Sequence, residues 1–329
     1  MLKLDISSPP EYTPPYLNGP RRFLIGGFSM AVKLSIGSWA YTFGPYQDNP
    51  IDLATVCRRL GELGFDGIEL GGFRPHAHPD DYATPAKRAE LKKLLSDNGL
   101  EVSAIAADFW SDALVPWEKA DGYRATFQKN LDFCTAIGIP TIRVDTVAPP
   151  PGPTGKERQD ALKKCAALWH ECAETAGKAN VKVTWEFEPG FCFNKPCEIV
   201  GMAKKVDHPN FGILLDACHA HMVAAVGARQ PEPIETLPNG ELDLIKKLKG
   251  KINHIHLIDS DNTLHHNETS THRPFGEGVL DFAKIIPAIL KAGYTSEWWV
   301  IDLCFWPQAW DVTEAAKKFL QPFIEKYGK

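Results

Sequence analysis

The stretch NHIHLIDSD, residues 253–261, places two histidines two positions apart in an otherwise apolar run, at His254 and His256. Side chains two apart on a β-strand point to the same side of the sheet. Imidazole binds many divalent metals and also carries protons near neutral pH. The pattern therefore predicts a strand that directs two imidazoles toward one site.

Four consecutive predicted strands end in residues that bind metals. These residues are Glu186 in WEFE, Asp216 in LLDA, His256 in HIHLID and Asp302 in VIDL. Carboxylate and imidazole ligands together suit a divalent cation of hard or borderline character. We therefore expect these residues to bind one divalent metal ion, Mn²⁺ by preference, with Mg²⁺, Co²⁺ or Zn²⁺ as alternatives. A single Glu or His is more often a solvated or hydrogen-bonded residue, so the prediction rests on all four.

Eight short apolar runs alternate with eight longer amphipathic runs along the chain. The apolar runs, which we predict to be strands, cover residues 33–39, 65–70, 101–107, 141–146, 181–188, 211–217, 252–259 and 298–303. Several helical patterns end in Gly just before the next strand, where Gly accepts the left-handed conformation. The pattern predicts an α/β fold of the (β/α)₈ TIM-barrel type, whose active sites lie at the carboxyl ends of the strands.

The N-terminal residues 1–32 are rich in Pro and lack periodicity, so we expect an extended or partly disordered N-terminal arm. Residues 33–329 are expected to form a single catalytic barrel domain.

Composition argues against several classes of protein. The net charge of −5 disfavours a nucleic-acid partner, and no apolar run is long enough to predict a membrane span. Eight cysteines without a CxxC pair are typical of a reduced, cytoplasmic protein. An endonuclease IV-like phosphodiesterase would need basic loops and three metals, so it is disfavoured as well.

The order of the motifs resembles the xylose-isomerase-like barrels, the sugar phosphate isomerase and epimerase group that includes ketose 3-epimerases and inosose dehydratases. The resemblance covers residues 33–327 and is carried by WEFEPG, LLDACHAH, HIHLIDSD, FGEGVLDF and GYTSEWWVID. It implies that Glu186, Asp216, His256 and Asp302 are the metal ligands. It also implies that His219 contacts a substrate hydroxyl, and that Glu186 and Asp302 move protons on opposite faces of a sugar. A homodimer or homotetramer, or a complex with a second kind of subunit, would follow from the same resemblance.

Two reactions are compatible with such a site. A metal that holds a carbonyl and its neighbouring hydroxyl acidifies the C–H between them, and a carboxylate then transfers the proton through an enediolate, as in an isomerase or epimerase. The same intermediate can instead expel a leaving group, as in a lyase or dehydratase acting on a keto-sugar, an inosose or a 3-keto-glycoside, similar to C-glycoside deglycosidases. Asp302 stands where the epimerases usually have Glu, and the histidines after the strand ends suit a lyase. A barrel without turnover that serves as a binding subunit is a third alternative.

Further residues are predicted to bind a small carbohydrate substrate. Aromatic rings stack on the apolar faces of sugars, and Trp39 and Trp110 are the favoured walls of the pocket. The polar candidates are His219, Glu188, His254, His78 and Arg273. His254 has an equally supported alternative as a hydrogen-bonded packing residue below the metal. The long loops at residues 147–155 and 222–238 are expected to close the site or to contact a second subunit.

Overall fold

The computed structural model describes residues 31–328, so the arm predicted at residues 1–32 lies almost entirely outside the described residues. Each of the eight predicted strands forms, and all belong to one parallel sheet. They are β1 (Lys33–Ile36), β2 (Gly67–Gly72), β3 (Glu101–Ala107), β4 (Thr141–Val144), β5 (Lys182–Glu186), β6 (Phe211–Asp216), β7 (Ile252–Leu257) and β10 (Trp298–Ile301). Their order is β1-β10-β7-β6-β5-β4-β3-β2, and a single parallel bridge between Gly37 and Glu69 joins the two end strands. This arrangement confirms the predicted TIM barrel.

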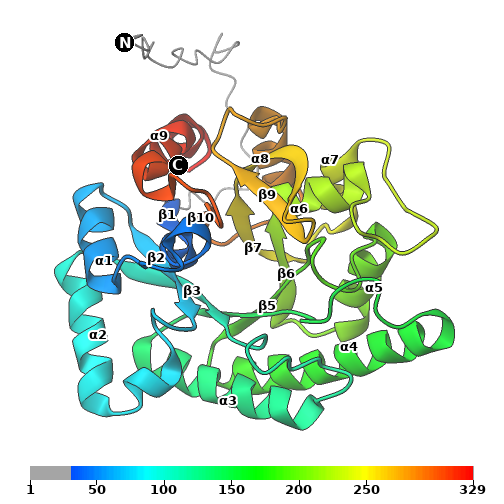
Figure 1. Ribbon diagram of the computed structural model, residues 1–329, viewed down its shortest axis with the longest axis horizontal. Helices are drawn as coiled ribbons and strands as arrows, with labels where there is room; N and C mark the ends of the chain where they lie inside the picture. The colour runs from blue at the N-terminus through cyan, green and yellow to red at the C-terminus, as the bar shows by residue number, and fades with distance from the viewer. Residues whose placement is uncertain (1–30, 329) are drawn as a thin grey trace.

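Helices surround the strands on the outside (Figure 1). They are α1 (Leu53–Glu62), α2 (Pro85–Asp97), α3 (Ala120–Ile137), α4 (Gly155–Lys178), α5 (Pro196–Val206), α6 (Ala217–His221), α7 (Gly240–Lys247), α8 (Phe282–Lys291) and α9 (Ala309–Tyr327). Local sequence explains several of their ends. Asp52 accepts a hydrogen bond from the Thr55 N–H at the start of α1, and Gly138 ends α3 with a φ of 96°. Within residues 31–328, no helix is both long and apolar enough to cross a bilayer.

The strands are buried on both faces, as expected for a parallel sheet covered by helices. Every residue of β2 and of β6 is buried. The apolar side chains of both faces join one large core, which includes Ile68, Leu70 and Leu215. Charged side chains that are fully buried therefore stand out, and those on β2, β5, β6 and β7 lie at or near the carboxyl halves of their strands.

The structure differs from the sequence prediction at two places near the barrel mouth. Residues after β7, predicted to be loop, form an antiparallel hairpin of β8 (Asp259–His265) and β9 (Thr269–Arg273), which packs on α6 (Figure 1). The loop expected at residues 222–238 begins with a π-helical turn, Met222–Val226, directly after α6. The hairpin sequence is polar on both faces, so it lacks the alternation that identifies a half-buried strand.

Candidate metal centre

The four predicted ligands lie together at the carboxyl ends of neighbouring strands. Glu186 ends β5, Asp216 ends β6, His256 lies in β7 and Asp302 directly follows β10, and one ligand atom from each lies within 4.8 Å of the others. All four are buried, with exposed fractions of 5%, 0%, 0% and 3%. We refer to Glu186, Asp216, His256 and Asp302 as the ligand set.

Several atoms of the ligand set have no hydrogen-bond partner among the described residues. These atoms are Glu186 Oε1, Asp216 Oδ2 and His256 Nδ1. His256 Nδ1 lies 3.0 Å from Glu186 Oε1 and 3.3 Å from Asp302 Oδ2. Buried polar atoms without partners cost free energy, and carboxylates gathered in one place repel each other. Three carboxylates and one imidazole are a donor set that a divalent cation would satisfy, so the residues fit a metal ion.

Glu69 on β2 orients His256 from behind, across the interior of the barrel. Its two carboxylate oxygens each lie 3.2 Å from His256 Nε2, and its Oε2 lies 2.7 Å from His254 Nε2. Burial alone would raise the pKa of Glu69, but the His256 and His254 rings lower it. A carboxylate on the Nε2 side leaves Nδ1 of His256 directed at the ligand set, as in many metal centres. The sequence analysis did not identify Glu69, although its position in the apolar run FDGIELGG was a signal.

His254 lies beneath His256 on the same side of β7, which agrees with the alternation read from the sequence. It is 1% exposed, and its Nε2 bonds to Glu69. This environment favours the packing alternative over contact with a substrate. Both histidines of the opening motif therefore point the same way, but His256 alone reaches the ligand set.

Arg143 on β4 was also not predicted, and it contacts the ligand set directly. Its Nη1 lies 2.5 Å from Glu186 Oε2, and its Nη2 donates a hydrogen bond to Asp145 at 3.3 Å. Burial would raise the pKa of Glu186, but Arg143 and His256 lower it to about 2. Burial raises the pKa of Asp145 to about 6 although Arg143 opposes the shift. The Arg143 guanidinium thus keeps Glu186 ionised by its contact with Oε2. The other carboxylate oxygen of Glu186, Oε1, remains directed at His256 and the rest of the ligand set.

Two histidines extend the site toward the hairpin. The backbone N–H of His219 donates to Asp216 Oδ1 at 2.7 Å, and its Nδ1 lies 2.8 Å from the Ser270 hydroxyl. His272 on β9 lies 3.5 Å from Asp302 Oδ1 through Nδ1 and 3.9 Å from Asp216 Oδ1 through Nε2. Neither ring nitrogen of His272 has a hydrogen-bond partner among the described residues. Burial lowers the pKa of His219 to about 3. Burial would also lower the pKa of His272, but the neighbouring carboxylates of Asp302 and Asp216 outweigh it and raise that pKa to about 9.

Glu188 connects strand five with the hairpin. The Thr269 hydroxyl donates a hydrogen bond to Glu188 Oε2, which also lies 3.4 Å from His219 Nε2. Burial raises the pKa of Glu188 to about 7 against the effect of the Thr269 hydrogen bond. The structure thus brings two predicted substrate-binding residues, Glu188 and His219, beside the ligand set.

The remaining candidates differ in position. Trp39 lies at the ligand set, because its Nε1 donates to Asp302 Oδ1 at 2.8 Å and its ring centroid is 5.7 Å from that of His256. Trp110 joins the same side of the mouth through Phe73, at 4.8 Å between centroids. By contrast, His78 caps the 3₁₀ turn Pro79–Tyr82, which packs on α2 and α3, so the structure does not bring it to the ligand set.

Arg273 follows His272 on the hairpin but is directed elsewhere. Its guanidinium carbon lies 4.6 Å from the Trp306 ring centroid, and its Nε is 3.6 Å from Asp261 Oδ2.

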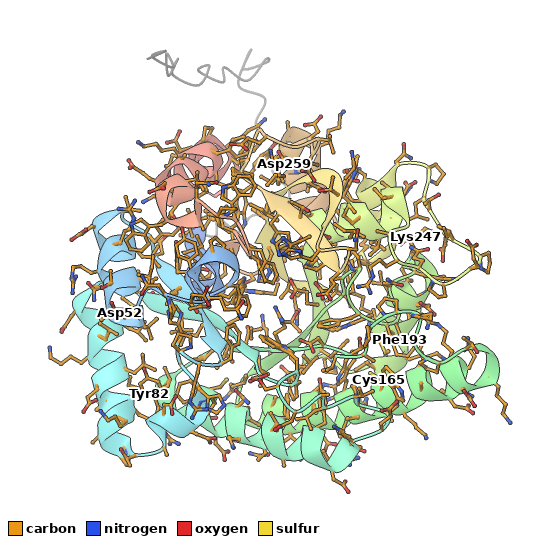
Figure 2. All side chains as sticks on the ribbon, viewed as in Figure 1. Asp52, Tyr82, Cys165, Phe193, Lys247 and Asp259 are labelled. Atoms are coloured by element: carbon orange, nitrogen blue, oxygen red, sulfur yellow. The ribbon has the colours of Figure 1, made fainter. Side chains whose placement is uncertain are left out.

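The acid of the HIHLIDSD motif, Asp259, has a structural position at the base of the hairpin (labelled in Figure 2). Its carboxylate accepts hydrogen bonds from the backbone N–H groups of Gly276, Gly278 and Leu280, at 3.0, 3.1 and 3.0 Å. A side chain on Gly278 would collide with Asp259, since a Cβ there would lie 2.3 Å from its Oδ1. The motifs HIHLIDSD and FGEGVLDF are therefore one structural unit that anchors the hairpin.

The comparison with protein families decides the family of this fold. The model of the xylose isomerase-like TIM barrel matches residues 57–321. The chain belongs to this family. Fructoselysine 3-epimerase from Escherichia coli O157:H7 is 22% identical over 264 residues, which cover 76% of this chain and 84% of that protein.

Two solved structures show how closely the fold is shared. A D-psicose 3-epimerase crystallised in the presence of D-fructose superimposes with a TM-score of 0.68 at 17% identity, covering 90% of this chain and 100% of that chain. The IolI protein with a bound zinc atom gives a TM-score of 0.64 at 16% identity, covering 90% and 99%. At these identities the likeness establishes the fold alone.

Proposed function

We propose that the protein is a divalent-metal-dependent sugar isomerase or epimerase. The observation that carries the proposal is the ligand set. One ligand atom from each of its four residues lies within 4.8 Å of the others, and among the described residues Glu186 Oε1, Asp216 Oδ2 and His256 Nδ1 have no hydrogen-bond partner. The fructoselysine and D-psicose 3-epimerases named above support the choice of a carbohydrate substrate.

Glu186, Asp216, His256 and Asp302 would hold a divalent cation, which would supply positive charge beside the oxygen of a sugar carbonyl and so make the adjacent C–H more acidic. Glu186 is the proton acceptor in this proposal, because Arg143 keeps it ionised and its Oε1 lacks a hydrogen-bond partner among the described residues. Asp302 would return the proton from the other side. Its Oδ1 accepts hydrogen bonds from Trp39 Nε1 at 2.8 Å and from the Cys304 N–H at 2.9 Å, which fixes the side chain.

His219 would position the substrate. Its Nδ1 contacts Ser270, so its Nε2 and the nearby Glu188 are the groups that remain for substrate hydroxyls. The hairpin thereby fixes both polar side chains beside the ligand set.

A lyase on a keto-sugar, inosose or 3-keto-glycoside is the second candidate, and His272 favours it. The ring is buried beside Asp302 and Asp216, and among the described residues neither nitrogen has a hydrogen-bond partner. A second acid or base in addition to Glu186 is what elimination requires, since the leaving group must be protonated as the C–H bond breaks.

Proton exchange in D₂O, followed by NMR, tests the proposal. Mn²⁺-loaded protein would be incubated with ketoses, inososes and 3-keto-glycosides. Deuterium next to the carbonyl in an otherwise intact sugar supports the isomerase or epimerase, and release of water or an aglycone supports the lyase.

Variants of the ligand set make the test specific. Glu186→Gln should abolish exchange, and Asp216→Asn should lose metal. Glu101→Gln is a matched control, because Glu101 is exposed at the opposite end of the barrel, where it pairs with Lys33. Full metal content together with full exchange in Glu186→Gln would contradict the proposed site.

A further inference from the structure

Two carboxylates of the ligand set each have one oxygen that a donor of the protein already holds. Arg143 Nη1 lies 2.5 Å from Glu186 Oε2, and the backbone N–H of His219 donates to Asp216 Oδ1 at 2.7 Å. The other oxygens, Glu186 Oε1 and Asp216 Oδ2, have no hydrogen-bond partner among the described residues. Each of these side chains therefore has one oxygen left for a cation.

The third carboxylate, Asp302, is held in the same way by two donors. Its Oδ1 accepts hydrogen bonds from Trp39 Nε1 at 2.8 Å and from the Cys304 N–H at 2.9 Å. Its Oδ2 lies 3.3 Å from His256 Nδ1 and so faces the ligand set. The set thus offers four atoms to a cation, three single carboxylate oxygens and one imidazole nitrogen.

The two side-chain donors, Arg143 and Trp39, are themselves fixed. The guanidinium carbon of Arg143 lies 5.9 Å from the centroid of the Trp39 ring, and its Nη2 donates to Asp145 at 3.3 Å. Trp39 is buried, and its indole lies against the backbone at Gly37, where a Cβ would come within 2.4 Å of the ring. Turning Glu186 or Asp302 to present both oxygens would leave a donor of this packed pair without its partner, which costs free energy.

Carboxylates that offer a single oxygen distinguish between divalent cations. Ca²⁺ takes about six to eight oxygen ligands in proteins and often uses both oxygens of a carboxylate. Mg²⁺ is smaller and needs fewer ligands, and Mn²⁺ accepts carboxylate oxygens in similar surroundings. Four protein atoms, one of them a nitrogen, are therefore a poor set for Ca²⁺ and a suitable one for the smaller cations.

We propose that Arg143 and Trp39 set the metal specificity of the site, by holding Glu186 and Asp302 as one-oxygen ligands and thereby excluding Ca²⁺ in favour of Mn²⁺ and Mg²⁺. This inference rests on the proposed function, whose metal site it describes. Arg143 and Trp39 act through the ligands and do not touch the cation, so they are positioning residues.

Displacement of Mn²⁺ by Ca²⁺ from the full chain tests the proposal. The EPR signal of free Mn²⁺ would report its release as CaCl₂ is added to the Mn²⁺-loaded protein, which gives the ratio of the two dissociation constants. We expect the unmodified chain to bind Mn²⁺ more tightly by about 100-fold or more. A ratio is the sensitive readout, because a general loosening of the site would weaken the binding of both cations.

Two variants should lower this ratio. Arg143→Met should lower it about ten-fold, because Glu186 Oε2 becomes free to bind the larger cation. Loss of the guanidinium charge affects both divalent cations alike, so it cancels in the ratio. Trp39→Phe should lower the ratio by less, since the Cys304 N–H still holds Asp302 Oδ1.

Trp185→Phe is the matched control for Trp39→Phe. Trp185 is fully buried in β5, and its Nε1 has no hydrogen-bond partner among the described residues. This variant should leave the ratio unchanged. Equal affinity of the unmodified chain for Mn²⁺ and Ca²⁺ would overturn the proposal, as would an unchanged ratio in both Arg143→Met and Trp39→Phe. If circular dichroism shows that Arg143→Met does not fold, Trp39→Phe alone decides, because it retains every charge.

The result is separable from that of the exchange experiment, since it needs no sugar. A chain that prefers Mn²⁺ as expected but exchanges no sugar hydrogen contradicts the proposed function alone. A chain that exchanges hydrogen but takes up Ca²⁺ as readily as Mn²⁺ contradicts the metal specificity alone. Absence of Mn²⁺ binding would contradict both.

Discussion

Replacing Glu69 with Gln tests whether the metal affinity depends on a residue that does not contact the metal. The carboxylate of Glu69 is fully buried and accepts from His256 Nε2 at 3.2 Å and from His254 Nε2 at 2.7 Å. Gln has nearly the same shape, but it carries no charge and offers only one acceptor oxygen. One of the two imidazole N–H groups would then face an amide NH₂.

The expected loss follows from the role of such carboxylates behind metal-binding histidines. Their removal typically weakens metal affinity by about 10- to 100-fold, which is about 1.4 to 2.7 kcal/mol. We place Glu69→Gln toward the upper end of this range, because its charge is fully buried and because it holds two histidines at once.

The assay is competition for Mn²⁺ against a fluorescent chelator, and circular dichroism of the metal-free protein establishes that the variant is folded. Glu101→Gln, an exposed Glu→Gln change, should alter the affinity less than two-fold. A folded Glu69→Gln protein whose Mn²⁺ affinity lies within two-fold of the unmodified chain would refute the assignment of Nδ1 of His256 as the ligand atom.

Four other predictions follow from contacts at the site and in the barrel. Arg143→Met removes the cation beside Glu186, so the pKa of Glu186 should rise above about 2. The acid limb of the plot of kcat/KM against pH should then move to higher pH, and an unmoved limb would contradict the role given to Arg143. His272→Gln should retain Mn²⁺ but slow elimination by about 100-fold while C–H exchange continues, and equal slowing of both steps would argue against a leaving-group acid. Removing metal with EDTA should lower the free energy of unfolding by about 2.7 kcal/mol relative to metal at 100 times its Kd, and Asp216→Asn should show no such difference. Burial lowers the pKa of His76 below its ordinary 6.5, so the unfolded chain takes up the proton first and stability is lost as pH falls below about 6.5. His76→Gln should lose less stability between pH 7 and 5 in thermal unfolding.

The sequence was sufficient to predict the barrel and the convergence of Glu186, Asp216, His256 and Asp302 at neighbouring strand ends. Parallel strands covered by helices are apolar on both faces, so a charged residue at the end of such a strand stands out, as Glu186 and Asp216 do. The geometry of a closed barrel then brings neighbouring strand ends together. Strand ends were predicted less well: β10 stops at Ile301, and Trp39 lies in a 3₁₀ turn rather than in β1.

Glu69 and Arg143 could not be assigned from the sequence, because their roles depend on distance across the barrel. Glu69 meets His256 although 187 positions separate them in the chain. Arg143 was read as part of an ordinary strand, since nothing in TIRVDT distinguishes an inward guanidinium from an outward one. The hairpin was missed for another reason. Its register is held by turns and by contacts such as Thr269 with Glu188, which leave no periodic apolar pattern.

The distribution of the ligand set along the chain has a consequence for synthesis on the ribosome. All four residues of the set come from β5, β6, β7 and the segment after β10. Glu69 in β2, Arg143 in β4 and Trp39 in the turn after β1, which contact three of them, come earlier in the chain. A growing chain therefore makes the supporting residues first and completes the ligand set only when the segment after β10 emerges. The insertion of β10 between β1 and β7 closes the barrel and delivers Asp302 in the same event. The proposed metal site is thus completed late in synthesis, with the arrival of the final strand.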